Sequence, residues 1–200
     1  MIPLMLDPGF PVLLAGRAAR ILGRLDLVEA SGAVDVKIFS DAPSPELVAR
    51  AGERLRPGLP QPADIAAARL LFVADLDDAS SRALALAARV HRVPVNVEDV
   101  PALCDFHVPA TVRRGKLLLT VSTGGAAPGA AARIRAELEQ RFDAGWATHL
   151  DHVAEARAGW RGAGLPQAEV ARRVSSLIEE SGWLPPAAPP ESSGSLINAF

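Results

Sequence analysis

Residues 11–41 read PVLLAGRAARILGRLDLVEASGAVDVKIFSD and contain an apolar run, a helical pattern and a second apolar run. The run at 11–15 is short and bounded by glycine, which is typical of a buried strand. Residues 18–30 carry apolar side chains at helical spacing, and residues 34–40 predict the next strand. A strand, a helix and a strand in this order predict a βαβ unit with parallel strands.

The same alternation continues through the first half of the chain. Short apolar runs at 70–74 and 94–97 predict two further strands, and residues 80–91 predict a helix between them. Ser44 precedes Pro45 and is placed to cap a short helix over 45–52. The sequence therefore predicts an α/β protein with a Rossmann-like parallel sheet.

After Gly115 the pattern changes. Residues 116–122 read as one strand and residues 128–142 as a helix, followed by helices at about 147–160 and 167–181. These segments predict a small α+β region at 113–145 and a helical C-terminal region at 146–184. The proline- and serine-rich residues 185–200 are typical of a flexible tail.

Composition narrows the class of protein. The chain has 200 residues, of which 49% are apolar and 22% charged, as expected of a chain that buries a core. The net charge of -2 argues against a nucleic-acid-binding protein. A single cysteine, Cys104, excludes an intramolecular disulfide, and the sequence shows neither a signal peptide nor an apolar run of membrane-spanning length. We expect a cytoplasmic protein that binds no membrane.

The turn after the first strand is the expected phosphate end of a dinucleotide site. In a Rossmann unit a glycine-rich turn lets the pyrophosphate approach the N-terminus of the following helix. Here the turn reads Ala15, Gly16, Arg17 and Ala18, with a single glycine. Arg17 is interpreted either as a partner for a phosphate or as an exposed helix residue.

The end of the second strand is the expected ribose end of the same site. Ser40 and Asp41 lie there, and an acidic side chain at this point accepts hydrogen bonds from both ribose hydroxyls. Asp41 thus indicates NAD rather than NADP. A turn-forming aspartate before Pro43 explains the same residue equally well.

Residues 93–129, VPVNVEDVPALCDFHVPATVRRGKLLLTVSTGGAAPG, combine a strand that ends in carboxylates, a Cys-Asp-Phe element, a basic segment and a Ser-Thr-Gly-Gly loop. This combination resembles the siroheme synthase dehydrogenase/chelatase family, whose enzymes oxidise precorrin-2 with NAD and insert iron into sirohydrochlorin. The family usually has three consecutive glycines at the first turn, where this chain keeps Ala15 and Gly16.

The resemblance implies that residues 1–112 bind NAD and that Asp99 is the catalytic acid/base of both reactions. A fixed carboxylate suits this chemistry, because both reactions remove protons from the macrocycle. A residue that caps the turn before Pro101 is the structural alternative for Asp99. The residues implied to bind NAD are Ala15, Gly16, Arg17, Ala18, Ser40, Asp41, Ala74 and Asp75.

The substrate carries many carboxylates, so its site should offer cationic side chains and free backbone N–H groups. Arg113 and Arg114 are expected in a basic turn, and a solvated hairpin explains them equally. His107 is interpreted as a substrate contact or as an ordinary, partly buried histidine. The residues implied to bind substrate are Asn96, His107, Arg113, Arg114, Ser122, Thr123, Gly124 and Gly125.

The predicted function is that of an NAD-dependent precorrin-2 dehydrogenase, with ferrochelatase activity on ferrous iron left open. The resemblance also implies a homodimer formed through residues 113–145. A tetrapyrrole-binding or metal-chelatase protein with a degenerate NAD site is the alternative, suggested by the depleted glycine turn. A regulatory module that senses NAD is a third reading.

Overall fold

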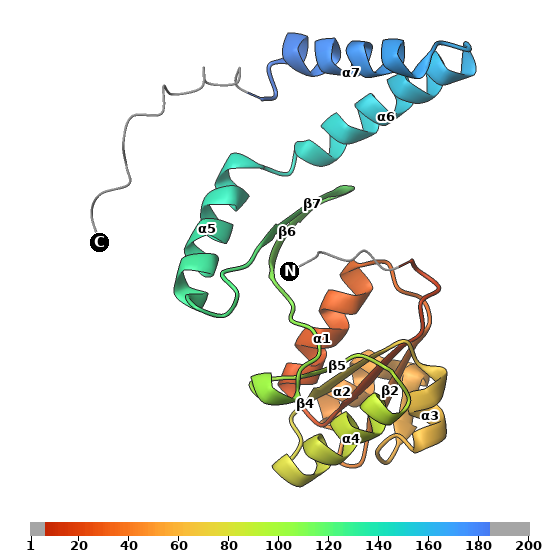
Figure 1. Cartoon of the computed structure of the whole chain (residues 1–200), viewed down its shortest axis with the longest axis vertical. Helices are drawn as coiled ribbons and strands as arrows, with labels where there is room; N and C mark the ends of the chain where they lie inside the picture. The colour runs from red at the N-terminus through yellow and green to blue at the C-terminus, as the bar shows by residue number, and fades with distance from the viewer. Residues whose placement is uncertain (1–6, 185–200) are drawn as a thin grey trace. The chain divides into compact units, whose positions relative to one another are not determined.

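The computed structural model describes residues 7–184, which divide into two compact units, one ending at Val108 and the other beginning at Pro109 (Figure 1). Residues 185–200, predicted to form a flexible tail, lie outside the described residues.

The first unit is a five-stranded parallel sheet in the order β3-β2-β1-β4-β5. The strands are β1 (Val12–Gly16), β2 (Val36–Ser40), β3 (Leu55–Pro57), β4 (Leu70–Ala74) and β5 (Val95–Val97). Strand β1 pairs with both β2 and β4, so the chain order reverses at its carboxyl end, where open α/β sheets bind ligands. The prediction of a Rossmann-like parallel sheet is confirmed.

Helices cover both faces of this sheet (Figure 1). They are α1 (Ala19–Ala30), α2 (Pro45–Ala51), α3 (Pro62–Ala67) and α4 (Asp78–Val90), with short 3-10 turns at Gly52–Arg54 and Pro101–Leu103. Alternate residues of β1 serve the two layers: Val12 and Leu14 pack with α1 and α2, whereas Leu13 and Ala15 pack with α3 and α4.

Several predicted boundaries move. The second strand begins at Val36 and not at residue 34, because Val34 is 76% exposed. The predicted helix at 45–52 forms as α2, where the Ser44 hydroxyl accepts a hydrogen bond from the Leu47 N–H at 3.2 Å. Strand β3 and helix α3 are too short to show a hydrophobic period, and the sequence did not predict them.

The outer edge of β5 is covered by the segment that follows it. The backbone N–H of Asp105 donates to the Val95 carbonyl at 2.8 Å, and the Val95 N–H donates to the Asp105 carboxylate at 3.2 Å. The N–H of Val97 donates to the sulfur of Cys104 at 3.3 Å. The Cys-Asp-Phe element therefore completes the hydrogen bonds of an edge strand.

The second unit contains a two-stranded sheet and three helices. Strand β6 (Ala110–Arg114) pairs antiparallel with β7 (Leu117–Val121), and α5 (Pro128–Arg141) packs against both strands. Helices α6 (Trp146–Gly162) and α7 (Gln167–Ser181) pack against each other (Figure 1). Arg113 and Arg114 pair with β7 as part of a strand, so the prediction of a turn at these residues is wrong and the alternative of a hairpin is confirmed.

The core of the second unit is small. Among its described residues, only Val112 and Val170 are buried hydrophobic side chains. Helices α5 and α6 bury no residue at all.

Replacing Gly16 by alanine should destabilise the first unit, because an added Cβ would lie 2.5 Å from the Ala74 carbonyl oxygen and 2.7 Å from the Ile21 Cβ. We expect a loss of about 1–3 kcal/mol in the free energy of unfolding, measured with urea. Gly23→Ala in the exposed middle of α1 is the control, since its Cβ meets nothing within 4 Å. It should gain about 0.5–1 kcal/mol, and equal losses in both variants would contradict the packing role of Gly16.

Candidate dinucleotide and catalytic site

Acidic and basic side chains gather at the carboxyl edge of the parallel sheet. Asp41 follows β2, Asp75 follows β4, and Asp99 lies two residues after β5. Arg17 and Arg20 lie at the start of α1, which begins at the same edge. The fold therefore concentrates charged groups at the switch point.

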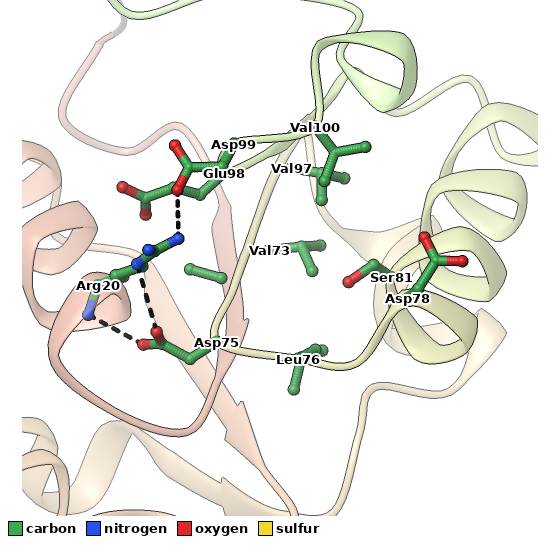
Figure 2. Close-up of a pocket in the computed structure, with 11 residues that line it drawn as sticks. Arg20, Val73, Asp75, Leu76, Asp78, Ser81, Val97, Glu98, Asp99 and Val100 are labelled. Atoms are coloured by element: carbon green, nitrogen blue, oxygen red, sulfur yellow. Dashed lines mark hydrogen bonds and ion pairs between the residues drawn. The ribbon is translucent and has the colours of Figure 1, made fainter.

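A cavity of about 280 Å³ opens at the ends of β4 and β5. Its wall includes Asp75 and Asp99 on one side and Asp78 and Ser81 of α4 on the other (Figure 2). Asp75 and Asp99 both have a left-handed backbone, with φ of 57° and 60°. This conformation costs a residue other than glycine roughly 1–2 kcal/mol, and here it occurs at two carboxylates of one cavity.

Arg20 connects these two carboxylates. Its guanidinium forms an ion pair with Asp99, and its Nε lies 4.0 Å from the Asp75 carboxylate (Figure 2). The Asp99 side chain is 69% exposed, so its carboxylate faces solvent while Arg20 fixes its position.

Asp75 also binds the N-terminus of α1. One oxygen of its carboxylate accepts hydrogen bonds from the backbone N–H groups of Ala18, Arg20 and Ile21, at 3.2, 2.9 and 3.2 Å. The N-cap residue Ala18 has no side chain that could satisfy these groups. Asp75 therefore caps α1 from the neighbouring strand.

Arg17 joins the ends of β2 and β4. It donates two hydrogen bonds of 2.7 Å to the Asp41 carboxylate and lies 3.5 Å from the Asp77 carboxylate. The hydrogen-bonded guanidinium of Arg17 holds the pKa of Asp41 below its ordinary value of 3.8. The pKa of Asp77 is also lowered, chiefly by the Ser80 N–H, which donates to it at 2.8 Å and marks Asp77 as the N-cap of α4.

A second cavity, of about 410 Å³, lies at the ends of β2 and β3. Its wall includes Ser40, Asp41, Pro57 and Gly58. The Ser40 side chain is buried, and its hydroxyl oxygen has no hydrogen-bond partner within the described structure. A buried polar atom without a partner is costly unless a ligand or water reaches it.

The other residues predicted to bind NAD lie at the carboxyl ends of β1 and β4. Ala15 and Ala74 are buried at the adjacent ends of β1 and β4. Gly16 is required by the close approach of α1 and β4, as the distances from its Cβ position show.

Asn96 and His107, both predicted to bind substrate, lie in different environments. Asn96 is buried, and its amide donates to the Phe106 carbonyl at 2.9 Å, so this group holds the following segment against β5. His107 is exposed, not partly buried.

Of the two arginines predicted to bind anions in the second unit, Arg114 has internal partners and Arg113 is exposed. Arg114 donates to the carbonyl of Phe142 at 2.8 Å and of Glu139 at 3.3 Å, which satisfies the C-terminal end of α5. Arg113 is exposed on β6.

The Ser-Thr-Gly-Gly loop is built by two left-handed glycines, Gly124 and Gly125, with φ of 64° and 85°. The Ser122 hydroxyl accepts from the Gly124 N–H and the Thr123 hydroxyl from the Ala127 N–H, each at 3.2 Å. Two of the N–H groups expected to meet an anion are therefore used within the loop.

Sequence reasoning missed Arg20 and the ion pair of Glu98. The signal for Arg20 was its place in the first turn of α1, where the helix dipole disfavours a cation unless an acid accompanies it. Glu98 lies 3.4 Å from Arg24, and one of its carboxylate oxygens is buried without a hydrogen-bond partner in the described residues. These ion pairs join residues that are far apart in the sequence, and only the folded sheet brings them together.

Residues 7–184 contain neither a cluster of metal-ligating side chains nor a membrane-spanning helix. No group of three or more His, Cys, Asp or Glu side chains there is arranged to hold a metal ion. None of the helices in this range has the length and hydropathy needed to cross a bilayer.

The fold and the charged edge define a Rossmann-type protein of the dinucleotide-binding class. Residues 8–110 match the family model described as putative NAD(P)-binding, and residues 114–141 match the model of the sirohaem biosynthesis protein central region. The chain belongs to the siroheme synthase N-terminal family.

Curated relatives match the chain over most of its length. It is 39% identical over 131 residues to a siroheme synthase of Methylococcus capsulatus, covering 64% of this chain and 28% of the relative. It is 34% identical over 150 residues to a siroheme synthase of Methylobacillus flagellatus, covering 74% of this chain and 32% of the relative. The chain thus spans less than a third of the length of these two relatives.

The fold is also similar to a solved structure of SirC, a precorrin-2 dehydrogenase. The two chains share a TM-score of 0.74 over 92% of each chain, with 22% sequence identity. This likeness supports the fold.

The titration of the Asp41 carboxyl group tests its hydrogen-bonded ion pair with Arg17. Because Arg17 lowers the pKa of Asp41 in the folded protein, Asp41 contributes stability above its unfolded pKa of about 3.9, which is lost as the pH falls through the depressed folded value. Arg17→Ala should return the pKa of Asp41 toward 3.8 and reduce this acid-dependent loss. A carboxyl NMR titration, with unfolding measured at neutral and acidic pH, checks both expectations.

Arg82→Ala is the matched control, because it removes one cation from an exposed ion pair with Asp78, 2.8 Å away, and leaves Arg17 in place. It should not move the Asp41 titration. If the pKa of Asp41 is the same with and without Arg17, the ion pair between Arg17 and Asp41 is ruled out.

Proposed function

We propose that this chain is an NAD-dependent precorrin-2 dehydrogenase that forms sirohydrochlorin. The observation that carries the proposal is the position of Asp99, an exposed carboxylate fixed by Arg20 at the mouth of a cavity on the ligand-binding edge of a Rossmann sheet. Membership of the siroheme synthase N-terminal family supports the substrate class.

The adenosine half of the edge fits a dinucleotide. Ser40 and Asp41 line the second cavity, where Asp41 would accept hydrogen bonds from ribose hydroxyls. The buried Ser40 hydroxyl has no partner in the described structure. Bound NAD would supply the two-electron acceptor for the oxidation. Ala15, Gly16, Arg17 and Ala18 would line its phosphates at the start of α1, together with Ala74 and Asp75 at the adjacent end of β4.

Asp99 would act as the base that accepts a proton from the macrocycle as conjugation develops. Its ion pair with Arg20 orients the carboxylate, and its exposure leaves room for a large substrate. Arg20 is thus a positioning residue.

The acidic rim of the substrate would be bound by cationic and backbone groups. Arg113 is exposed and available, while Arg114 stabilises the end of α5 beside it. His107 is also exposed and would reach a substrate carboxylate. The loop formed by Ser122, Thr123, Gly124 and Gly125 would also bind substrate carboxylates. Asn96 would support the segment that carries His107.

Insertion of ferrous iron into sirohydrochlorin is a second activity for the same carboxylate. Iron here is a substrate, and Asp99 would remove the pyrrole protons that it replaces. A tetrapyrrole-binding or chelatase function without redox chemistry is the alternative, favoured by one observation: the phosphate end of α1 already holds the Asp75 carboxylate.

We further propose that the chain forms a homodimer through residues 113–145. The second unit buries only Val112 and Val170 among its described residues, which is too little to stabilise a separate domain. Ile134 on α5 is 47% exposed and offers apolar surface for a second copy.

Asp99→Asn should lower the rate of precorrin-2 oxidation by about 10²-fold or more, because it removes the carboxylate base. The fold and NAD binding should stay intact, since asparagine has nearly the same shape as aspartate. Sirohydrochlorin absorbance under anaerobic conditions measures the rate. Asp35→Asn, an exposed residue before β2 at the opposite edge of the sheet, removes the same charge and should keep full activity. Full activity of Asp99→Asn would refute the assigned role.

Light scattering coupled to gel filtration should give twice the mass of one chain. Ile134→Glu should shift this mass toward the monomer, whereas Leu86→Glu, on the 66%-exposed Leu86 of α4, should not. A monomeric unmodified protein at micromolar concentration would disprove the dimer.

A further inference from the structure

The backbone N–H groups at the start of α1 are already occupied by an anion of this chain. A helix leaves its first N–H groups without intrahelical partners, and in a Rossmann unit these groups face the phosphates of a dinucleotide. In this protein one oxygen of Asp75 accepts hydrogen bonds from three of them.

The carboxylate is held firmly in this position. The Asp75 side chain is only 16% exposed, and Arg20 approaches its second oxygen. Its left-handed backbone, with φ of 57°, turns the chain at the end of β4 so that the side chain reaches across to α1.

An independent observation places a ligand site along the same edge. Ser40 lines the second cavity, and its buried hydroxyl has no hydrogen-bond partner in the described structure. Arg17 extends from the start of α1 to Asp41 in the wall of that cavity. The adenosine half of the edge is therefore open, while its phosphate half is filled.

We propose that Asp75 competes with the phosphates of the dinucleotide for the N-terminus of α1 and thereby limits the affinity of this chain for NAD. The inference rests on the proposed function for the identity of the dinucleotide. A phosphate and a carboxylate cannot accept from the same three N–H groups, and their charges repel each other. Binding therefore requires Asp75 to leave α1.

Inorganic pyrophosphate tests, without NAD, whether the Asp75 carboxylate keeps phosphates away from the N-terminus of α1. Asp75→Ala and Asp75→Asn both remove the competing charge, and Asn keeps a side-chain acceptor that preserves the cap if Ala fails to fold. Pyrophosphate should raise the melting temperature of the folded variants in a saturable manner and leave the unmodified protein unchanged. Asp26→Asn, which removes an exposed carboxylate on the body of α1, is the charge-matched control and should behave as the unmodified protein.

Calorimetric titration with NAD tests the consequence. The Asp75 variants should bind NAD about tenfold or more tightly than the unmodified protein and Asp26→Asn, as expected when a capping interaction no longer has to be broken. Equal NAD affinities, or equal stabilisation of all proteins by pyrophosphate, would overturn the inference. If pyrophosphate stabilises only the Asp75 variants and NAD binds none of the proteins, Asp75 is the competitor for phosphate and the proposed NAD-dependent function fails.

Discussion

The close approach of Gly16 to Ala74 and Ile21 is the contact on which the rest of the first unit depends. Because no side chain stands at Gly16, helix α1 begins directly at the carboxyl end of the central strand and lies against β4. This placement brings the acids that follow β2, β4 and β5 within reach of the first turn of α1. A single glycine suffices for the packing of helix on sheet, which explains why the turn forms although arginine follows it.

The charged edge is a set of mutually paired groups. Arg17 binds the acid after β2, and Arg20 lies between the acids after β4 and β5. A cation in the first turn of a helix opposes the helix dipole, and the carboxylates of Asp75 and Asp99 offset this cost for Arg20. As a result, the guanidinium of Arg20 contacts both Asp75 at the phosphate end of the site and the proposed catalytic carboxylate of Asp99. Movement of one carboxylate therefore affects the position of the other.

The sequence predicted the sheet because its long, strongly patterned segments determine the fold. Residues 11–41 carry two buried strands and an amphipathic helix, and these formed with shifts of one or two residues. The three-residue strand β3 carries no readable period, and only the second strand of the β6–β7 hairpin was predicted. Antiparallel pairing with β7 places Arg113 and Arg114 in a strand.

The candidate site was predictable only at the level of position. Asp41, Asp75 and Asp99 are found from the rule that ligands meet the carboxyl ends of parallel strands. Their partners depend on side chains that lie 24 to 79 residues away in sequence, as in the pairs Arg17–Asp41 and Arg20–Asp99, and no local pattern encodes such contacts. The bond from Asp75 to the start of α1 also depends on a left-handed backbone that aspartate adopts only in a minority of cases.

Both edges of the five-stranded sheet carry features that oppose further pairing. On one side the Cys-Asp-Phe element satisfies the outer N–H and C=O of Val95, and on the other the short strand β3 ends at Pro57, which has no N–H to donate. An open strand edge is a template on which other chains add strands and aggregate. The segment that most resembles an enzyme of tetrapyrrole chemistry therefore also protects the folded sheet from edge-to-edge association, so a substitution in it would reduce solubility.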